Sequence, residues 1–394
     1  MKNRNYRQTV YACFIGYIVQ AIVNNFAPLL FVCFQNEFGI SLNKITLLVS
    51  VNFAVQLLVD ATAALYVDKI GYRVSCILAH VFSAGGLMSM AFLPDILSDS
   101  FAGLMVSVIL YAIGGGLIEV LISPIMESCP SENRQKAMSL LHSFYCWGHV
   151  GVVMISTLFF SLFGIGNWRI MAMLWAIVPV LNIILFARVP IAPLVSEQEE
   201  RISFADLVRN RLFWLFILMM ICSGASEQSV SQWASSFAEK GLGISKTLGD
   251  LLGPMMFALL MGTSRAIYGR HGDRMDQRSF MIFSSVLCIA SYLLISLAPH
   301  PFVSLAGCAI CGFSVGIMWP GTISSAAVLR NGGTVLYALL ALAGDVGCSA
   351  GPAVAGLVSG IFSDNLKTGI LAAAIFPVLL LISLLAYRNN SSQK

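Results

Sequence analysis

Long apolar segments alternate with short polar ones along the whole chain. Twelve of them, each of about 20 residues or more, consist mainly of Leu, Ile, Val, Phe, Ala and Gly, and this length crosses the hydrocarbon core of a bilayer as a helix. Apolar and polar positions do not alternate within these segments, which excludes the strands of a transmembrane barrel. The pattern predicts an all-α polytopic membrane protein with twelve transmembrane helices, at residues 9–35, 44–66, 74–94, 101–127, 137–163, 169–188, 212–237, 247–269, 279–298, 302–328, 333–361 and 367–387.

The only long polar segment lies between the sixth and seventh apolar segments. It runs from Val189 to Arg211 and is rich in Glu, Asp and Arg. We expect it to be a cytoplasmic linker between two six-helix halves. The predicted division is therefore residues 1–188, 189–211 and 212–394.

The two halves share motifs in equivalent segments. A Gly precedes a Pro at the same spacing in the fourth and tenth segments, and a pair of Gly recurs in the fifth and eleventh. The matching positions are Gly116 and Pro124 with Gly312 and Pro320, then Gly148 and Gly151 with Gly344 and Gly347. Several matches in corresponding segments indicate parallel duplication of a six-helix unit.

Composition and charge agree with a membrane protein. Hydrophobic residues make up 58% and charged residues 11% of the chain, whereas soluble domains carry roughly 25% charged residues. The net charge of +4 comes from basic residues in the connections, so it is no nucleic-acid footprint. With the N-terminus inside, most Lys and Arg fall on one side, which places both termini in the cytoplasm. The apolar segment after Arg7 is too long for a cleaved signal peptide.

A carboxylate interrupts the fourth apolar segment. Glu119 follows three glycines, Gly114 to Gly116, and precedes Pro124. An ionised carboxylate at a helix centre costs at least about 2.5–3.5 kcal/mol, so such a residue usually faces a watery cavity, a partner or a proton path. The alternative is a protonated Glu that is hydrogen-bonded inside the bundle. We interpret Glu119 as the functional centre.

A charge motif follows the second segment, where Asp68, Lys69, Gly71 and Arg73 resemble the signature of the major facilitator superfamily. Ala64 stands where the first Gly of that signature is usual, and Tyr72 where a basic residue is common. A corresponding cluster in the second half runs from Gly269 to Arg274. The resemblance implies two six-helix halves that rock around a midplane site, with gating roles for Asp68, Arg73, Arg270 and Asp273.

The fourth segment also resembles the fucose permease branch of sugar–proton symporters, through Gly115, Gly116, Glu119, Ser123 and Pro124. That branch has an Asn pair in its first helix, and Asn24 and Asn25 match it. The proton-coupling Asp that follows the pair in that branch is missing, because Phe26, Ala27 and Pro28 come next. The resemblance implies a proton-coupled carrier. Because the Asp is missing, the resemblance does not identify the substrate of this chain.

Further polar and aromatic residues inside the segments are candidates for the site. We expect proton coupling by Glu119, Asp345 and Glu227, and substrate binding by Asn24, Asn25, Glu119, His142, His149, Glu227, Gln228, Trp233 and Trp319. His149 and Asp345 are equivalent in the repeat and are candidates for a charge pair. Core packing is the alternative for both Trp residues, and separate structural roles are the alternative for His149 and Asp345.

Two other expectations concern residues outside this set. Asp60 is expected to form a structural ion pair, with Arg265 as the candidate partner. His80, Glu37 and Glu127 lie nearer the ends of segments and are expected to be solvated.

Enzyme signatures are absent from the sequence. It has no phosphate-binding loop, no metal-ligand spacing and no nucleophile–base arrangement, so we expect no enzyme activity, cofactor or metal. The Cys308–Cys311 pair is interpreted as packing, and no disulfide framework is expected.

The preferred hypothesis is a secondary active transporter for a small polar solute, expected to be a sugar, by proton symport and alternating access. A drug–proton antiporter on the same fold is the alternative, since 17 Met and 25 Phe suit an adaptable apolar pocket. The expected partners are the solute, the proton and the lipid bilayer, with no nucleic acid. We expect a monomer in a bacterial inner membrane.

Overall fold

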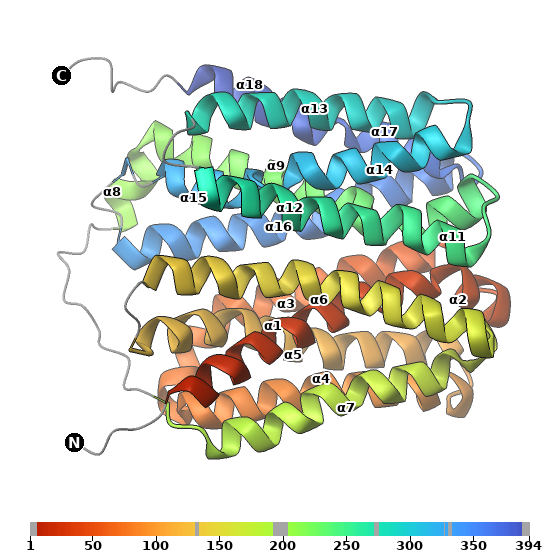
Figure 1. Cartoon of the computed structure of the whole chain (residues 1–394), viewed down its shortest axis with the longest axis horizontal. Coiled ribbons are helices and arrows are strands. Elements are labelled where there is room, and N and C mark those ends of the chain that lie inside the picture. Colours follow the sequence, from red (N-terminus) through yellow and green to blue (C-terminus); the bar gives the residue numbers. More distant parts are fainter. Residues whose placement is uncertain are drawn as a thin grey trace. The chain divides into compact units, whose positions relative to one another are not determined.

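The computed structural model describes residues 6–130, 134–191, 204–271, 276–326, 328–329 and 333–387 (Figure 1). These residues form helices and connections without any strand. Among these described residues, twelve helical spans are long and apolar enough to cross a membrane, which confirms the predicted fold class. Most of their ends lie within a few residues of the predicted ends. The spans are Arg7–Phe38, Leu42–Ala63, Tyr72–Ile96, Ser100–Ser128, Leu140–Phe163, Ile165–Arg188, Arg211–Gly241, Lys246–Tyr268, Gln277–Leu297, Pro301–Ala326, Ala338–Ile361 and Leu366–Ala386.

The helices cluster into two compact units. The first comprises Met1–Ser196 together with Ser245–Leu251, and the second comprises Glu197–Ile244 together with Leu252–Lys394. In the first unit, α4 packs on α5 and α7, α3 packs on α5, and α1 packs on α6. Its helices are α1 (Arg7–Asn25), η1 (Ala27–Leu30), α2 (Phe31–Phe38), α3 (Leu42–Ile70), α4 (Tyr72–Ile96), α5 (Ser100–Ser128), α6 (Arg134–Phe163), η2 (Ile165–Asn167), α7 (Trp168–Arg188) and α11 (Lys246–Asp250).

The second unit repeats this packing. Its helix α9 packs on α16 and α18, α13 packs on α14, and α12 packs on α14. The helices are α8 (Phe204–Arg209), α9 (Arg211–Ser231), α10 (Ala234–Ser236), η3 (Phe237–Gly241), η4 (Leu251–Met255), α12 (Met256–His271), α13 (Gln277–Leu297), α14 (Pro301–Val315), α15 (Met318–Ala326), α16 (Gly333–Ile361), α17 (Leu366–Ala373) and α18 (Ile375–Ala386).

Equivalent glycines make equivalent close approaches in the two units. A Cβ added at Gly116 on α5 would lie 3.0 Å from the Gln56 carbonyl oxygen on α3. One added at Gly312 on α14 would lie 2.7 Å from Cα of Phe257 on α12. Only a residue without a side chain permits these contacts. The predicted parallel repeat of six-helix units is therefore visible in the packing itself.

The repeat also includes an arginine clamp. Arg73, at the start of α4, donates to the carbonyl oxygens of Phe186, Ala187 and Val189 at the end of α7, at 2.6, 2.8 and 2.7 Å. Arg278, at the start of α13, donates to Leu384 and Leu385 at the end of α18, at 3.2 and 3.4 Å. The last carbonyls of a helix lack intrahelical donors, and a cation there is favourable. The structural counterpart of Arg73 is thus Arg278.

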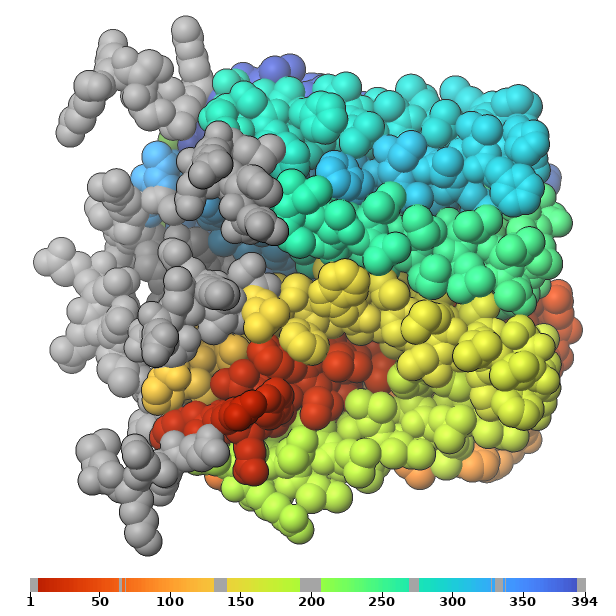
Figure 2. Space-filling view, viewed as in Figure 1, coloured from red at the N-terminus to blue at the C-terminus, as the bar shows by residue number. Residues whose placement is uncertain are grey.

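Apolar side chains cover the faces that lipid would contact. On α7 a stripe of exposed residues recurs every three or four positions, and Figure 2 shows this helix at the surface of the first unit. The stripe consists of Ile170, Leu174, Ile177, Leu181 and Ile184.

One expectation about solvation is wrong. His80 is fully buried in α4, with Nδ1 2.7 Å from the Cys76 carbonyl oxygen and Nε2 2.8 Å from Asn182 Nδ2. His80 differs from the prediction because α7 packs over its side chain. Glu37 accepts from Trp168 Nε1 at 2.8 Å and pairs with Arg169 at 2.7 Å. Glu37, despite these contacts, and Glu127 are both exposed, as expected.

Candidate functional site

Amide side chains surround Glu119 in the first unit. On α1 Gln20 and Asn24 are four residues apart, and on α3 Asn52 and Gln56 have the same spacing, so each pair lies on one face of its helix. We call these four residues the amide cluster. They are buried, with at most 6% of any of them exposed. A buried polar group is costly without a partner, so their hydrogen bonds decide how they are oriented.

The hydrogen bonds of the amide cluster form one connected network. Gln56 Nε2 donates to Asn24 Oδ1 at 2.9 Å and to Asn52 Oδ1 at 3.1 Å. Asn52 Nδ2 donates to Asn24 Oδ1 at 3.4 Å. Gln20 Nε2 donates to Gln56 Oε1 at 3.1 Å and to Glu119 Oε2 at 3.2 Å. The network therefore ends on the carboxylate that the sequence singled out.

A glycine on α5 leaves room for the amide cluster. A Cβ added at Gly115, one turn before Glu119, would lie 3.2 Å from Gln20 Oε1 and 3.3 Å from Gln56 Cδ and Oε1. These distances are shorter than most distances between a Cβ atom and its neighbours in proteins. The Gly-rich approach to Glu119 thus lets the amide heads of α1 and α3 lie directly against α5.

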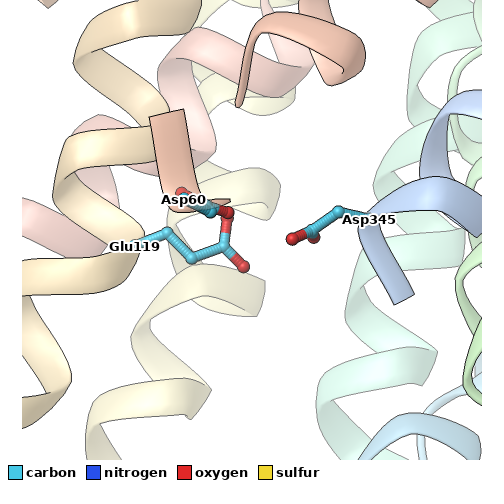
Figure 3. Close-up of side chains that lie close together, drawn as sticks. All are labelled: Asp60, Glu119 and Asp345. Carbon is cyan, nitrogen blue, oxygen red and sulfur yellow. The ribbon is translucent and has the colours of Figure 1, made fainter. Parts of the chain in front are cut away.

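A second carboxylate lies beside Glu119. One oxygen of Asp60, on α3, and one of Glu119, on α5, are within 4.8 Å of each other, and Figure 3 shows a Glu119 oxygen directed towards Asp60. We call Asp60 and Glu119 the carboxylate pair. Both residues are partly exposed. The third side chain labelled in Figure 3, Asp345, belongs to the second unit and is described with it.

Other predicted residues of the first unit lie on α1 and α6. Asn25, at the end of α1, donates to Tyr145 Oη at 3.3 Å and to the Ala21 carbonyl oxygen at 3.0 Å. His142 is exposed on α6, with its ring edge-to-face against Tyr17 at 5.3 Å between centroids. His149 is buried on the same helix. Its predicted pairing with Asp345 would join the two units and stays a prediction.

The second unit has its own buried carboxylate on α9. Glu227 Oε2 lies 3.5 Å from a guanidinium nitrogen of Arg265 on α12, whose Nε donates to the Gly316 carbonyl oxygen at 3.2 Å. Gln228 Nε2 donates to Glu227 Oε1 at 3.3 Å, and Gln232 Nε2 donates to Gln228 Oε1 at 3.1 Å. Glu227 is therefore paired with a cation inside its own unit.

The remaining candidates of the second unit are Trp233, Trp319 and Asp345. Trp233 is fully buried, and its Nε1 donates to the Pro352 carbonyl oxygen at 3.1 Å, which is the environment of a packing residue. Trp319 is partly exposed on α15, with its ring against Gly344 of α16. Asp345 is buried on α16.

The predicted gating residues are only partly covered by the structure. The side chains of Asp68 and Arg270 and the whole of Asp273 lie outside the described residues. Arg73 is described, and its recorded bonds go to carbonyl oxygens of its own unit. Within either unit by itself, the described His, Cys, Asp and Glu side chains form no group of three placed to share a metal ion.

Gln20, Asn52 and Gln56 were not among the residues predicted from the sequence. A signal was present, because amide residues four apart recur within two apolar segments, at Gln20 with Asn24 and at Asn52 with Gln56. Spacing of this kind places polar groups on one helix face, although only the packing of α1 on α5 shows that the face meets Glu119.

Comparison with known proteins identifies the family. The sequence model of the Major Facilitator Superfamily matches residues 12–352. The chain belongs to this superfamily. It is therefore an integral multi-pass transporter and not an enzyme, and alternating access is the mechanism known for structures of the superfamily. No curated protein matches the sequence.

Solved structures of superfamily members share the fold. The fucose:proton symporter FucP of E. coli is 16% identical with a TM-score of 0.69, over 98% of this chain and all of that one. The xylose transporter XylE of E. coli is 13% identical with a TM-score of 0.79, over 98% of both chains. A bacterial homologue of the human lysosomal transporter Spinster is 15% identical with a TM-score of 0.75, over 96% of both chains. At these identities the likeness concerns the fold alone.

Proposed function

We propose that this transporter moves a small polar solute, a sugar or sugar-like compound, together with a proton, and that Glu119 carries the proton. The observation that carries the proposal is the carboxylate pair at the end of the amide cluster. At the 4.8 Å limit, two ionised carboxylates repel each other by about 3 kcal/mol at an effective dielectric constant of about 20. One bound proton removes that repulsion.

The sequence around the carboxylate pair supports a proton as the coupling ion. Neither α3 within two turns of Asp60 nor any part of α5 contains Lys or Arg. Loading Glu119 makes the site less charged, and a neutral carboxyl is cheaper to enclose in an apolar surrounding than an ionised one. Proton release towards the cytoplasm would then accompany release of the solute.

Polar groups of α1 and α6 suit an uncharged polyol. Asn24 and Asn25 on α1, Tyr145 on α6 and the exposed His142 offer both donors and acceptors to sugar hydroxyls. In the second unit we assign Gln228 and Glu227 to the same task, with Trp319 as the aromatic face. Trp233 is better explained by packing, because its ring is buried and its indole nitrogen is bonded.

Two further groups of residues have proposed roles. His149 and Asp345 are proposed to pair and to assist proton movement, while Asp68, Arg73, Arg270 and Asp273 are proposed to hold the closed state. The distribution of Lys and Arg supports cytoplasmic termini in a bacterial inner membrane, and we propose a functional monomer.

The direction in which protons move relative to the solute tests the proposed function. The purified protein is reconstituted into liposomes that contain a pH-sensitive dye, and sugars are added outside. Symport predicts that the interior becomes more acidic only with a transported sugar. The alternative, a drug–proton antiporter, predicts no response to any sugar and proton movement opposite to that of a cationic drug.

A further inference from the structure

In the buried side-chain amide of Gln20, the NH2 group has hydrogen-bond partners and the carbonyl oxygen has none. Its Nε2 donates to both Gln56 Oε1 and Glu119 Oε2, which uses both of its hydrogens. Among the described residues, none donates to its Oε1, and that atom is buried. A buried acceptor without a donor is unusual and needs an explanation.

The orientation of Gln20 follows from the rest of the amide cluster. Gln56 uses both amide hydrogens on Asn24 and Asn52, so its Oε1 is the end that faces Gln20. Gln20 must therefore present its NH2 group to Gln56, and the same group then reaches Glu119. The cluster thus directs a donor at the carboxylate, and a donor favours the ionised form.

The unsatisfied oxygen suits the other protonation state. A protonated Glu119 carries an O–H that needs an acceptor, and Asp60 is the other titratable group beside it in the first unit. Turning the Gln20 amide over would exchange its nitrogen and its oxygen, so that Oε1 replaces Nε2 next to the carboxyl. The other amides of the cluster would turn over with it, because Gln56 Oε1 faces Gln20 in the present arrangement and two oxygens cannot share a hydrogen bond. Gln20 can therefore serve both states without moving its backbone.

We propose that Gln20 is the positioning residue of the Glu119 proton site. Its amide donates to the ionised carboxylate and, turned over, accepts from the protonated carboxyl, so that neither state is left without a partner. This inference rests on the proposed role of Glu119 as the proton carrier. It adds a residue that acts through Glu119 rather than on the solute.

The test compares Gln20→Met, which keeps the length of the side chain and removes both polar ends, with the wild type. Proton-driven accumulation and counterflow are measured on the same vesicles. Because a hydrogen bond to a charged group is strong, we expect Gln20→Met to lower the accumulation ratio about tenfold while counterflow persists. Gln20→Asn, which keeps the amide but is one methylene shorter, is the second variant and should also lower the ratio.

The matched control is Asn182, another buried amide of the first unit. It donates to the Ala12 carbonyl oxygen at 3.1 Å and faces His80, away from the carboxylate pair. Asn182→Leu should lower the melting temperature without changing the ratio of accumulation to counterflow. If it changes that ratio as much as Gln20→Met does, the effect of Gln20 is only structural and the inference is wrong.

Infrared difference spectroscopy gives a readout that needs no transport. The carboxyl band of protonated Glu119 is the band that disappears in Glu119→Gln. In Gln20→Met it should move to higher wavenumber, because the carboxyl loses a hydrogen-bond partner. An unshifted band would overturn the role of Gln20.

Failure of this inference differs from failure of the proposed function. If Glu119→Gln itself accumulates solute, Glu119 is not the proton carrier and the function proposal fails. If Glu119→Gln does not accumulate solute but Gln20→Met does so like the wild type, only the role of Gln20 is wrong. In the double variant, Gln20→Met should cause no further loss beyond that of Glu119→Gln.

Discussion

Asp60 on α3 and Glu119 on α5 bring carboxylate oxygens within 4.8 Å of each other inside one unit of the protein. Helix packing enforces this proximity, because α5 lies close to α3 where Gly116 faces the Gln56 backbone. Two such groups are coupled, so the proton affinity of either depends on the charge of the other. The predictions below begin with this pair.

Replacing Glu119 by Gln keeps the size of the side chain and imitates a permanently neutral carboxyl. We expect Glu119→Gln to bind solute and to exchange it between two pools. It should not concentrate solute with a proton gradient, because no proton is loaded or released. Counterflow and gradient-driven uptake on one vesicle preparation measure this, and accumulation at the wild-type level would refute the role of Glu119.

Replacing Asp60 by Asn removes the like charge beside Glu119. Without that charge Glu119 is easier to ionise, so loading it requires a higher proton concentration. We expect the pH of half-maximal uptake to fall by about one pH unit. Uptake measured from pH 5 to pH 8 tests this. An unchanged profile would show that the two carboxylates titrate independently.

The arginine clamps predict a graded loss of stability. Arg73 makes three short bonds to helix-end carbonyls, whereas Arg278 makes two longer ones. We expect Arg73→Gln to cost about 2 kcal/mol or more in the free energy of unfolding, and Arg278→Gln to cost less. Arg73→Lys should be nearly as destabilising as Arg73→Gln, because one ammonium group cannot donate to several carbonyl oxygens in the geometry of a guanidinium. Thermal unfolding in detergent measures the order, and equal losses would contradict it.

The helix cap of α13 predicts a pH-dependent contribution to stability. Asp276 accepts from Ser279 N at 2.9 Å and from Ser279 Oγ at 2.5 Å, and these bonds hold the pKa of the carboxyl below its usual value. A lowered folded-state pKa means that the stabilisation is present above about pH 4, the pKa of an unfolded Asp, and is lost as pH falls through the folded-state pKa. Because the side chain is exposed, we expect Asp276→Ala to cost only about 0.5–1 kcal/mol at pH 7.

A neutral cap is the control for Asp276. Asn365 caps α17 by accepting from Lys367 N at 3.0 Å and carries no charge at any pH. The melting temperature of Asn365→Ala should therefore differ from that of the wild type by the same amount at pH 7 and pH 3. The difference for Asp276→Ala should shrink at pH 3, and a constant difference would show that the charge of Asp276 contributes nothing.

The twelve spans and their parallel repeat could be predicted from the sequence, because both depend on local patterns. A helix in a bilayer must be apolar over its whole length, so the hydropathy of each segment determines its state without reference to other segments. Glu119 stood out for the same reason, since a carboxylate in an apolar segment is costly wherever the helix packs. The charge motif and the shared Gly and Pro positions also predicted the division of the chain into two halves.

Only the tertiary structure decided which polar faces meet. Gln20, Gln56 and Asp60 lie far from Glu119 along the chain, and their contact depends on α1 and α3 both packing against α5. Likewise, the burial of His80 and Trp233 depends on neighbouring helices rather than on their own segments. Hydropathy fixes the length of a transmembrane helix but only weakly its rotation, and rotation decides which side chains share a site.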